Sequence, residues 1–239
     1  MEVINYLLGF KNYFIVQDTQ MFNFSLDSVL LPNFVTINKN INKILDIGCG
    51  NAPIPLILST KTKAEIIGVE IQKEVFNLAT KSVKINNLEQ QIKIINADIK
   101  DIYNDFETES FDVITCNPPF FKVNKESNLN NNDYKTIARH EVKLNLDDIF
   151  KIAKKILKNN GYIAIVHRPE RLLEILFTMK KYPKHPKEII LIYLKKNMPA
   201  DILLIEGTKN GKEGLKILPP IYTHMKNGEY TKQIKKYFE

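Results

Sequence analysis

Cysteine is nearly absent from this chain of 239 residues, which contains only Cys49 and Cys116. The two lie far apart, and neither belongs to a CxxC or Cys/His spacing. This scarcity argues against a zinc site and against a disulfide framework. We therefore expect two structural thiols and no metal.

Long hydrophobic runs are also lacking. No run of about 18 uncharged apolar residues offers a membrane span, and the N-terminus lacks a basic segment followed by a small-residue cleavage site. These absences predict a soluble, cytoplasmic protein. No linker rich in Gly, Ser or Pro divides the chain, so we expect one domain over 1–239, in which 1–40 extend a core at 41–239. No sequence feature fixes the oligomeric state, and a monomer is our expectation.

Arginine is scarce among the basic residues. Only Arg139, Arg168 and Arg171 are arginines, out of 34 Lys and Arg residues. The net charge of +7 suits a polyanionic partner, because Lys and Arg near phosphates release counterions. Asn, Ile and Lys are abundant throughout, however, as biased codon usage would also make them. Charge alone therefore leaves nucleic-acid binding open.

From residue 43 onward, short apolar runs alternate with segments of helical period, which predicts a mostly parallel sheet with helices on both faces. The predicted strands are KILDIG (43–48), EIIGVE (65–70), IKIINA (92–97), FDVITC (111–116) and GYIAIVH (161–167). A helix is expected between the second and third strands. Another is expected over 149–157, with Asn159-Asn160-Gly161 as its stop.

After residue 185, the runs EIILIYLKK and DILLIEGTK are too close for a helix to lie between them, so they are expected to be antiparallel. The whole pattern is typical of an α/β, Rossmann-like class I methyltransferase sheet: seven strands, mostly parallel, with an antiparallel C-terminal pair. The polar, Asn-rich stretch 122–135 predicts a mobile loop.

Three successive strands end in residues suited to binding a ligand. In open α/β sheets, ligands bind outside the carboxyl ends of the strands. The first strand ends in Asp46, Gly48 and Gly50, the second at Glu70 and the third at Asp98. Glycines permit close approach of the backbone, and the two later carboxylates suit a ribose and an adenine amine. Singly, these residues could form a tight turn, a solvated strand end or a helix cap; together they predict an adenosine.

The glycine pattern distinguishes between adenosine cofactors. A dinucleotide fingerprint requires GxGxxG, but Pro53 stands at the third glycine position. S-adenosylmethionine carries no phosphate, and its D-x-G-x-G motif is supplied by Asp46, Gly48 and Gly50. We therefore expect S-adenosylmethionine as the cofactor.

The fourth strand closes in TCNPPFF, residues 115–121. Consecutive prolines stiffen the backbone, so the Asn117 side-chain oxygen and the Pro118 carbonyl can be aimed at one amino group, and Phe120 can stack on the ring that carries it. Such acceptors stabilise the transition state of an amine that becomes cationic as it attacks. An ordinary proline turn is the simpler alternative. We predict that Asn117, Pro118 and Phe120 are catalytic.

These motifs resemble those of the amino-group methyltransferases with an Asp/Asn-Pro-Pro-aromatic signature, and more narrowly the bacterial tRNA adenine N6-methyltransferases that modify adenine 37 of valine tRNA. The resemblance covers nearly the whole chain, through ILDIGCGNAPIPLIL, FDVITCNPPFF, GYIAIVHRPERL and LPPIYTHMKNGEYT. It implies tRNA as the substrate. It also implies donor binding by the residues at the strand ends: Asp46, Gly48, Gly50, Glu70, Ile71, Asp98, Ile99 and Asn117.

Two further positions matter in the comparison with this family. Asp27, in LDSVLL, is expected near the methionine end of the donor. Ala52 stands where the family usually continues Gly-Asn-Gly, and its methyl could be tolerated beside the donor or weaken binding.

For RNA contact we expect Arg139, His140, Arg168 and Arg171, because Arg recognises phosphates in a bidentate manner. The alternative is an internal ion-pair network with Glu141 or Glu170. His140 and His167 could equally be satisfied structural imidazoles.

Three other functions stay open. A glutamine N5-methyltransferase of release factors shares the NPP motif, but that family carries a separate helical N-terminal domain. An rRNA guanine N2-methyltransferase uses the same amino-group chemistry. A catalytically inactive RNA-binding protein is the alternative outside the enzymes, with Ala52 as the suspect position.

Overall fold

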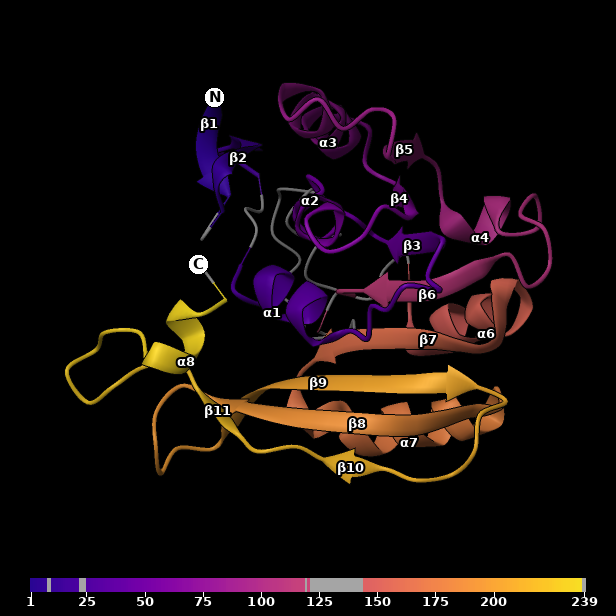
Figure 1. Ribbon diagram of the computed structural model, residues 1–239, viewed down its shortest axis with the longest axis vertical. Coiled ribbons are helices and arrows are strands. Elements are labelled where there is room, and N and C mark those ends of the chain that lie inside the picture. The colour runs from indigo at the N-terminus through magenta and orange to yellow at the C-terminus, as the bar shows by residue number, and fades with distance from the viewer. Residues whose placement is uncertain (8–9, 22–24, 119, 121–143, 238–239) are drawn as a thin grey trace, which may run out of the picture.

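The computed structural model describes residues 1–7, 10–21, 25–118, 120 and 144–237. Its central sheet has the strand order β8-β9-β7-β6-β3-β4-β5 (Figure 1). The strands are β3 (Lys43–Ile47), β4 (Glu65–Glu70), β5 (Ile92–Asn96), β6 (Phe111–Cys116), β7 (Leu157–His167), β8 (Lys184–Tyr193) and β9 (Ala200–Lys209). Only β9 runs antiparallel to its neighbours among these seven. The expected methyltransferase-type sheet is confirmed, and two short strands, β10 (Lys216–Ile217) and β11 (Ile221–Tyr222), add to β8.

Helices cover both faces of the sheet. They are α1 (Asp27–Phe34), α2 (Pro53–Ser59), α3 (Lys73–Ile85), α4 (Ile99–Ile102), α6 (Leu146–Ile156), the 3-10 turn η1 (Pro169–Arg171), α7 (Leu172–Lys181) and α8 (Lys232–Lys235). No helix within the described ranges is long and apolar enough to cross a membrane.

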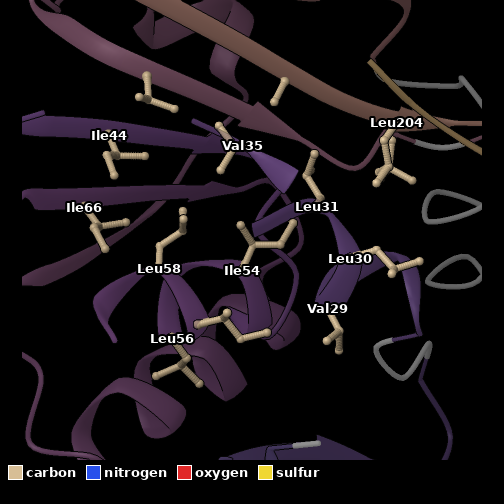
Figure 2. Close-up of a cluster of buried hydrophobic side chains, with 14 of the residues drawn as sticks. Val29, Leu30, Leu31, Val35, Ile44, Ile54, Leu56, Leu58, Ile66 and Leu204 are labelled. Atoms are coloured by element: carbon tan, nitrogen blue, oxygen red, sulfur yellow. The ribbon is translucent and has the colours of Figure 1, made fainter. Parts of the chain in front are cut away.

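The core has two halves because successive strand residues point to opposite faces. Ile44 of β3 belongs to the same buried cluster as Leu31 of α1 and Ile54 of α2 (Figure 2). Its neighbour Leu45 belongs to the other half, together with Phe150 of α6. The near-continuous apolar runs of the sequence thus reflect strands that are buried on both sides.

One predicted boundary was wrong. The helix expected to stop at Asn159-Asn160-Gly161 ends at Ile156, and β7 begins at Leu157. Asn160 does adopt a left-handed conformation, with φ of 61°. It does so inside an irregularity of β7, where the pairing with β6 shifts register, and not at a helix end.

The N-terminal extension contains a hairpin, β1 (Glu2–Leu7) and β2 (Phe10–Asp18), that docks on α3 through side chains. Val16 N donates to Ser82 Oγ at 2.9 Å, and Phe14 N donates to Asn86 Oδ1 at 2.9 Å. Asn51 Nδ2 donates to the Val16 carbonyl at 2.9 Å. The extension is therefore joined directly to the glycine turn that follows β3.

Candidate active site

The turn after β3 offers an open backbone surface. Gly48 and Gly50 have φ of 70° and 56°, a left-handed conformation that favours glycine. A Cβ built on either residue would meet no heavy atom within 4 Å. The turn therefore has room for a ligand to lie directly against its backbone.

Ala52 closes this turn in a left-handed conformation, with φ of 72°. Its side chain is fully buried, whereas the space beside Gly48 and Gly50 is open. The methyl that replaces the family's usual glycine is thus enclosed by protein. Its cost is backbone strain, of about 1–2 kcal/mol.

Asp46, at the end of β3, is a buried carboxylate with one unpaired oxygen. Its Oδ1 accepts from Thr115 Oγ1 at 2.7 Å, and its Oδ2 has no hydrogen-bond partner within the described structure. Burial raises the pKa of Asp46 to about 7; the Thr115 bond lowers it and the charge of Glu70 raises it. An unpaired, buried carboxylate oxygen fits a ligand that brings an amino group.

Glu70, at the end of β4, faces the same turn. Its two oxygens accept from Gly50 N at 3.0 Å and from Gln72 N at 2.8 Å. Burial raises the pKa of Glu70, and the backbone donors oppose this effect. Each oxygen keeps a second lone pair, which suits the adjacent hydroxyls of a ribose.

Asp98 follows β5 and caps α4. Its Oδ1 accepts from Lys100 N at 2.9 Å, which is the helix-cap role considered as the alternative. The adjacent Ile99 is buried and Ile71 is half-buried. Asn96 Nδ2 donates to the Ile71 carbonyl at 3.1 Å and so fixes the chain after β4.

The chain leaving β6 presents an amide of defined orientation. Asn117 Nδ2 lies 3.3 Å from Ser28 Oγ, at the start of α1. Because the NH₂ end of the amide is held there, its carbonyl end is left to accept from a ligand. Pro118 is buried, and the Phe120 ring lies 5.4 Å from the His167 imidazole.

Helix α1 is itself fixed to the sheet. Glu206 of β9 accepts from Thr36 N and from Thr36 Oγ1, each at 2.7 Å, just after the helix ends. At its other end, Asp27 Oδ2 accepts from Ser25 Oγ at 2.9 Å, and burial raises the pKa of Asp27. Asp27 therefore lies one residue from the serine that holds Asn117.

The two arginines in the described chain form ion pairs. Arg168 pairs with Asp201 at 2.7 Å, and Arg171 pairs with Glu174 at 2.9 Å. Arg171 also donates to the Phe120 carbonyl at 3.5 Å. Pro119, Arg139, His140, Glu141 and the predicted loop 122–135 lie outside the described residues.

Several site residues gave no signal in the sequence. Ser28 is 89 positions from Asn117, and Thr115 is 69 positions from Asp46. Asn51 belongs to the glycine motif, but its bond to β2 spans 35 positions. Contacts of this range follow from the tertiary fold and from no local pattern.

Gly68 of β4 packs against Cys49 of the glycine turn, so a side chain at position 68 should disturb the turn. A Cβ there would lie 2.8 Å from Cys49 Sγ and 2.9 Å from Ile94 Cδ1. We expect Gly68→Ala to lower the free energy of unfolding by about 1–3 kcal/mol, measured by urea denaturation. Adding Cys49→Ala should restore part of the loss; two independent, additive losses would show that Cys49 is not the obstacle.

Comparisons with known proteins identify the family of the chain. A family model described as a methyltransferase domain matches residues 38–211. A relative from Trichodesmium erythraeum, a tRNA1(Val) (adenine(37)-N6)-methyltransferase, is 30% identical over 207 residues, which cover 80% of this chain and 84% of the relative. The chain belongs to this methyltransferase family. The expected class, an enzyme that uses S-adenosylmethionine, is thereby confirmed.

Other relatives carry the same name. The protein from Flavobacterium psychrophilum is 27% identical over an alignment that covers 85% of this methyltransferase and 93% of the relative. The protein from Bacteroides fragilis is 23% identical, with 96% of each chain covered. Among solved structures, a predicted O-methyltransferase from Agrobacterium tumefaciens matches with a TM-score of 0.70 at 19% identity, covering 89% of this chain and 95% of that one. That likeness supports the fold alone.

Proposed function

We propose that this methyltransferase transfers a methyl group from S-adenosylmethionine to the exocyclic N6 amino group of an adenine in tRNA, at position 37 of valine tRNA. The observation that carries the proposal is the Asn117 amide, held by Ser28 at the tip of β6 beside the glycine turn of β3. The printed names of the relatives support the choice of substrate.

The residues at the tips of β3, β4 and β5 fit the donor. The open backbone of Gly48 and Gly50 leaves room for it, and the unpaired Asp46 Oδ2 suits its amino group. Glu70 is assigned to the ribose. The adenine of the donor is assigned to Ile71, Asp98 and Ile99. When bound, S-adenosylmethionine supplies an electrophilic methyl group.

The residues after β6 act on the acceptor amine. The nitrogen lone pair of an adenine amino group is delocalised into the ring, so the amine is a weak nucleophile. Asn117 Oδ1 and the Pro118 carbonyl accept hydrogen bonds from its two N–H groups and favour the pyramidal form that attacks. The protons become acidic as the nitrogen becomes cationic, so these acceptors stabilise the transition state more than the ground state. Phe120 supports the base by stacking, at about 1–3 kcal/mol.

The surface charge suits an RNA. The net charge is +7, and Arg168 keeps a third of its side chain exposed although it pairs with Asp201. An exposed ion pair of this kind contributes about 0–1 kcal/mol, so a phosphate can replace the carboxylate at little cost. Arg168 and Arg171, with Arg139 and His140, remain the residues that we assign to the RNA backbone.

The test uses tritiated S-adenosylmethionine and unmodified valine tRNA transcripts that carry A or G at position 37. We expect label in the A transcript and none in the G transcript. Label in the G transcript alone would make the adenine assignment wrong. Calorimetry with the donor separates out the non-catalytic alternative, since no binding at millimolar donor would favour an RNA-binding protein without activity.

A further inference from the structure

His167 ends β7, the strand next to β6 on the side away from the donor residues. The strand order is β7-β6-β3-β4-β5, so Asn117 lies between His167 and the tips that we assign to the donor. The imidazole is fully buried, and its centroid lies 5.4 Å from that of Phe120. His167 therefore adjoins the acceptor side of the site.

The hydrogen bonds of the imidazole fix its tautomer. Nδ1 accepts from the backbone N–H of Arg168 at 2.8 Å. Because Nδ1 must keep its lone pair for this bond, the proton of a neutral ring resides on Nε2. Nε2 is buried and has no hydrogen-bond partner within the described structure. Within the described residues, the ring is therefore half satisfied.

The ring also stays neutral. Burial lowers the pKa of His167 to about 4, the nearby charges of Arg171 and Arg168 act in the same direction, and Glu174 opposes them. A neutral ring with its proton on Nε2 has no lone pair to offer at that atom, so it does not act there as a general base. It can only donate. Buried donors without a partner are costly, which points to a ligand that brings an acceptor.

We propose that His167 is a specificity residue that donates from Nε2 to a ring nitrogen of the target adenine while Asn117 and Pro118 hold its amino group. This inference rests on the proposed function. The ring nitrogens N1, N3 and N7 of adenine are all hydrogen-bond acceptors, and the buried Nε2–H next to the stacking ring of Phe120 suits such an acceptor. His167 and Asn117 would then contact different atoms of one base.

The test is a series of anticodon stem-loop RNAs in which the target adenosine is replaced by 1-deaza-, 3-deaza- or 7-deazaadenosine. Each change replaces one ring nitrogen by C–H and leaves the amino group in place. With the wild-type chain, we expect one of the three RNAs to lose roughly 10- to 100-fold in kcat/KM, and the others to stay within about threefold of adenosine.

Variants test whether His167 is the hydrogen-bond donor. His167→Leu should lose the same factor on the adenosine RNA and nothing further on the sensitive deaza RNA. His167→Gln, whose amide can reach the position of Nε2, should recover part of the loss. His185→Gln, a control on β8, should match the wild type with every RNA. The affinity for S-adenosylmethionine, measured by calorimetry, should be the same in all variants.

The outcomes separate this inference from the function on which it rests. Methylation of all four RNAs by the wild type with equal kcat/KM would overturn the role of His167 and leave the adenine methyltransferase intact. If His167→Leu still lost activity from the adenosine RNA to the sensitive deaza RNA by the same factor as the wild type, the role of His167 would also be overturned. No methylation of the adenosine RNA would overturn both. The comparison of the four RNAs uses the wild-type chain alone, so it does not depend on whether a variant folds.

Discussion

Asn117→Ala is expected to cut turnover by at least about tenfold, because one preorganised hydrogen-bonding group can contribute about 100- to 1,000-fold in a transition state. Affinity for S-adenosylmethionine should be unchanged, because we assign the Asn117 oxygen to the acceptor amine and S-adenosylmethionine to residues at the ends of β3 to β5. Single-turnover kinetics with labelled donor measure the first quantity, and calorimetry measures the second.

A matched pair of controls tests the role of the amide oxygen. Asn117→Asp keeps an oxygen at the acceptor position, so turnover should stay within a few-fold of the wild type. Ser28→Ala removes only the partner that orients the amide, at 3.3 Å, and should cost less than Asn117→Ala. If Asn117→Ala turns over as fast as the wild type, the chain after β6 does not touch the reacting amine.

Asp46→Asn is expected to make the protein more stable at neutral pH and less able to bind the donor. The carboxyl is fully buried, and its pKa is raised from 3.8 to about 7, mainly by burial. Between these two values the folded state holds a proton that the unfolded state has lost. The free energy of unfolding of the wild type therefore falls as pH rises through this window. Asparagine has no such dependence.

The gain should therefore depend on pH in a defined way. Below pH 3.8, this effect should make little difference between the free energies of unfolding of the two proteins. Above pH 7, the variant should be more stable by about 2–4 kcal/mol. Urea denaturation at pH 4 and pH 8 measures the difference. A variant that is less stable than the wild type at pH 8 would show that the ionised carboxylate is not a cost to the fold.

Donor binding should respond in the opposite sense. An ionised Asp46 accepts from the donor's amino group, so donor affinity of the wild type should rise with pH between about 6 and 8. Asp46→Asn should bind the donor about 10- to 100-fold more weakly and without this pH dependence. The same pH dependence in both proteins would place the titrating group elsewhere, with Glu70 the next candidate because its pKa is also raised.

Strand ends were the part of the site that the sequence predicted well. EIIGVE and FDVITC coincide with β4 and β6, and KILDIG differs from β3 by one residue. Buried parallel strands are short apolar runs, and their ends are marked by the residues that break them, such as Gly48 and Pro118. The parallel direction of the first strands followed from the same pattern, because a parallel connection needs a crossover helix.

Local signals failed where two structures use the same residues. Asn160 can end a helix or sit in a strand irregularity, since both need a left-handed residue, and the pairing of β7 with β6 decided between them. The sequence also could not predict that Ser28 orients Asn117, or that His167 Nε2 meets no acceptor among the described residues. Each depends on elements that meet only in the folded chain.

The identity of the methylated nucleoside tests the central claim most directly. Valine tRNA transcript is incubated with the chain and S-adenosylmethionine, digested to nucleosides and analysed by chromatography with mass spectrometry. The account predicts N6-methyladenosine from position 37 and no other new methylated nucleoside. Methylated guanosine, or adenosine methylated on a ring nitrogen, would contradict it, because neither places an exocyclic adenine amine at Asn117.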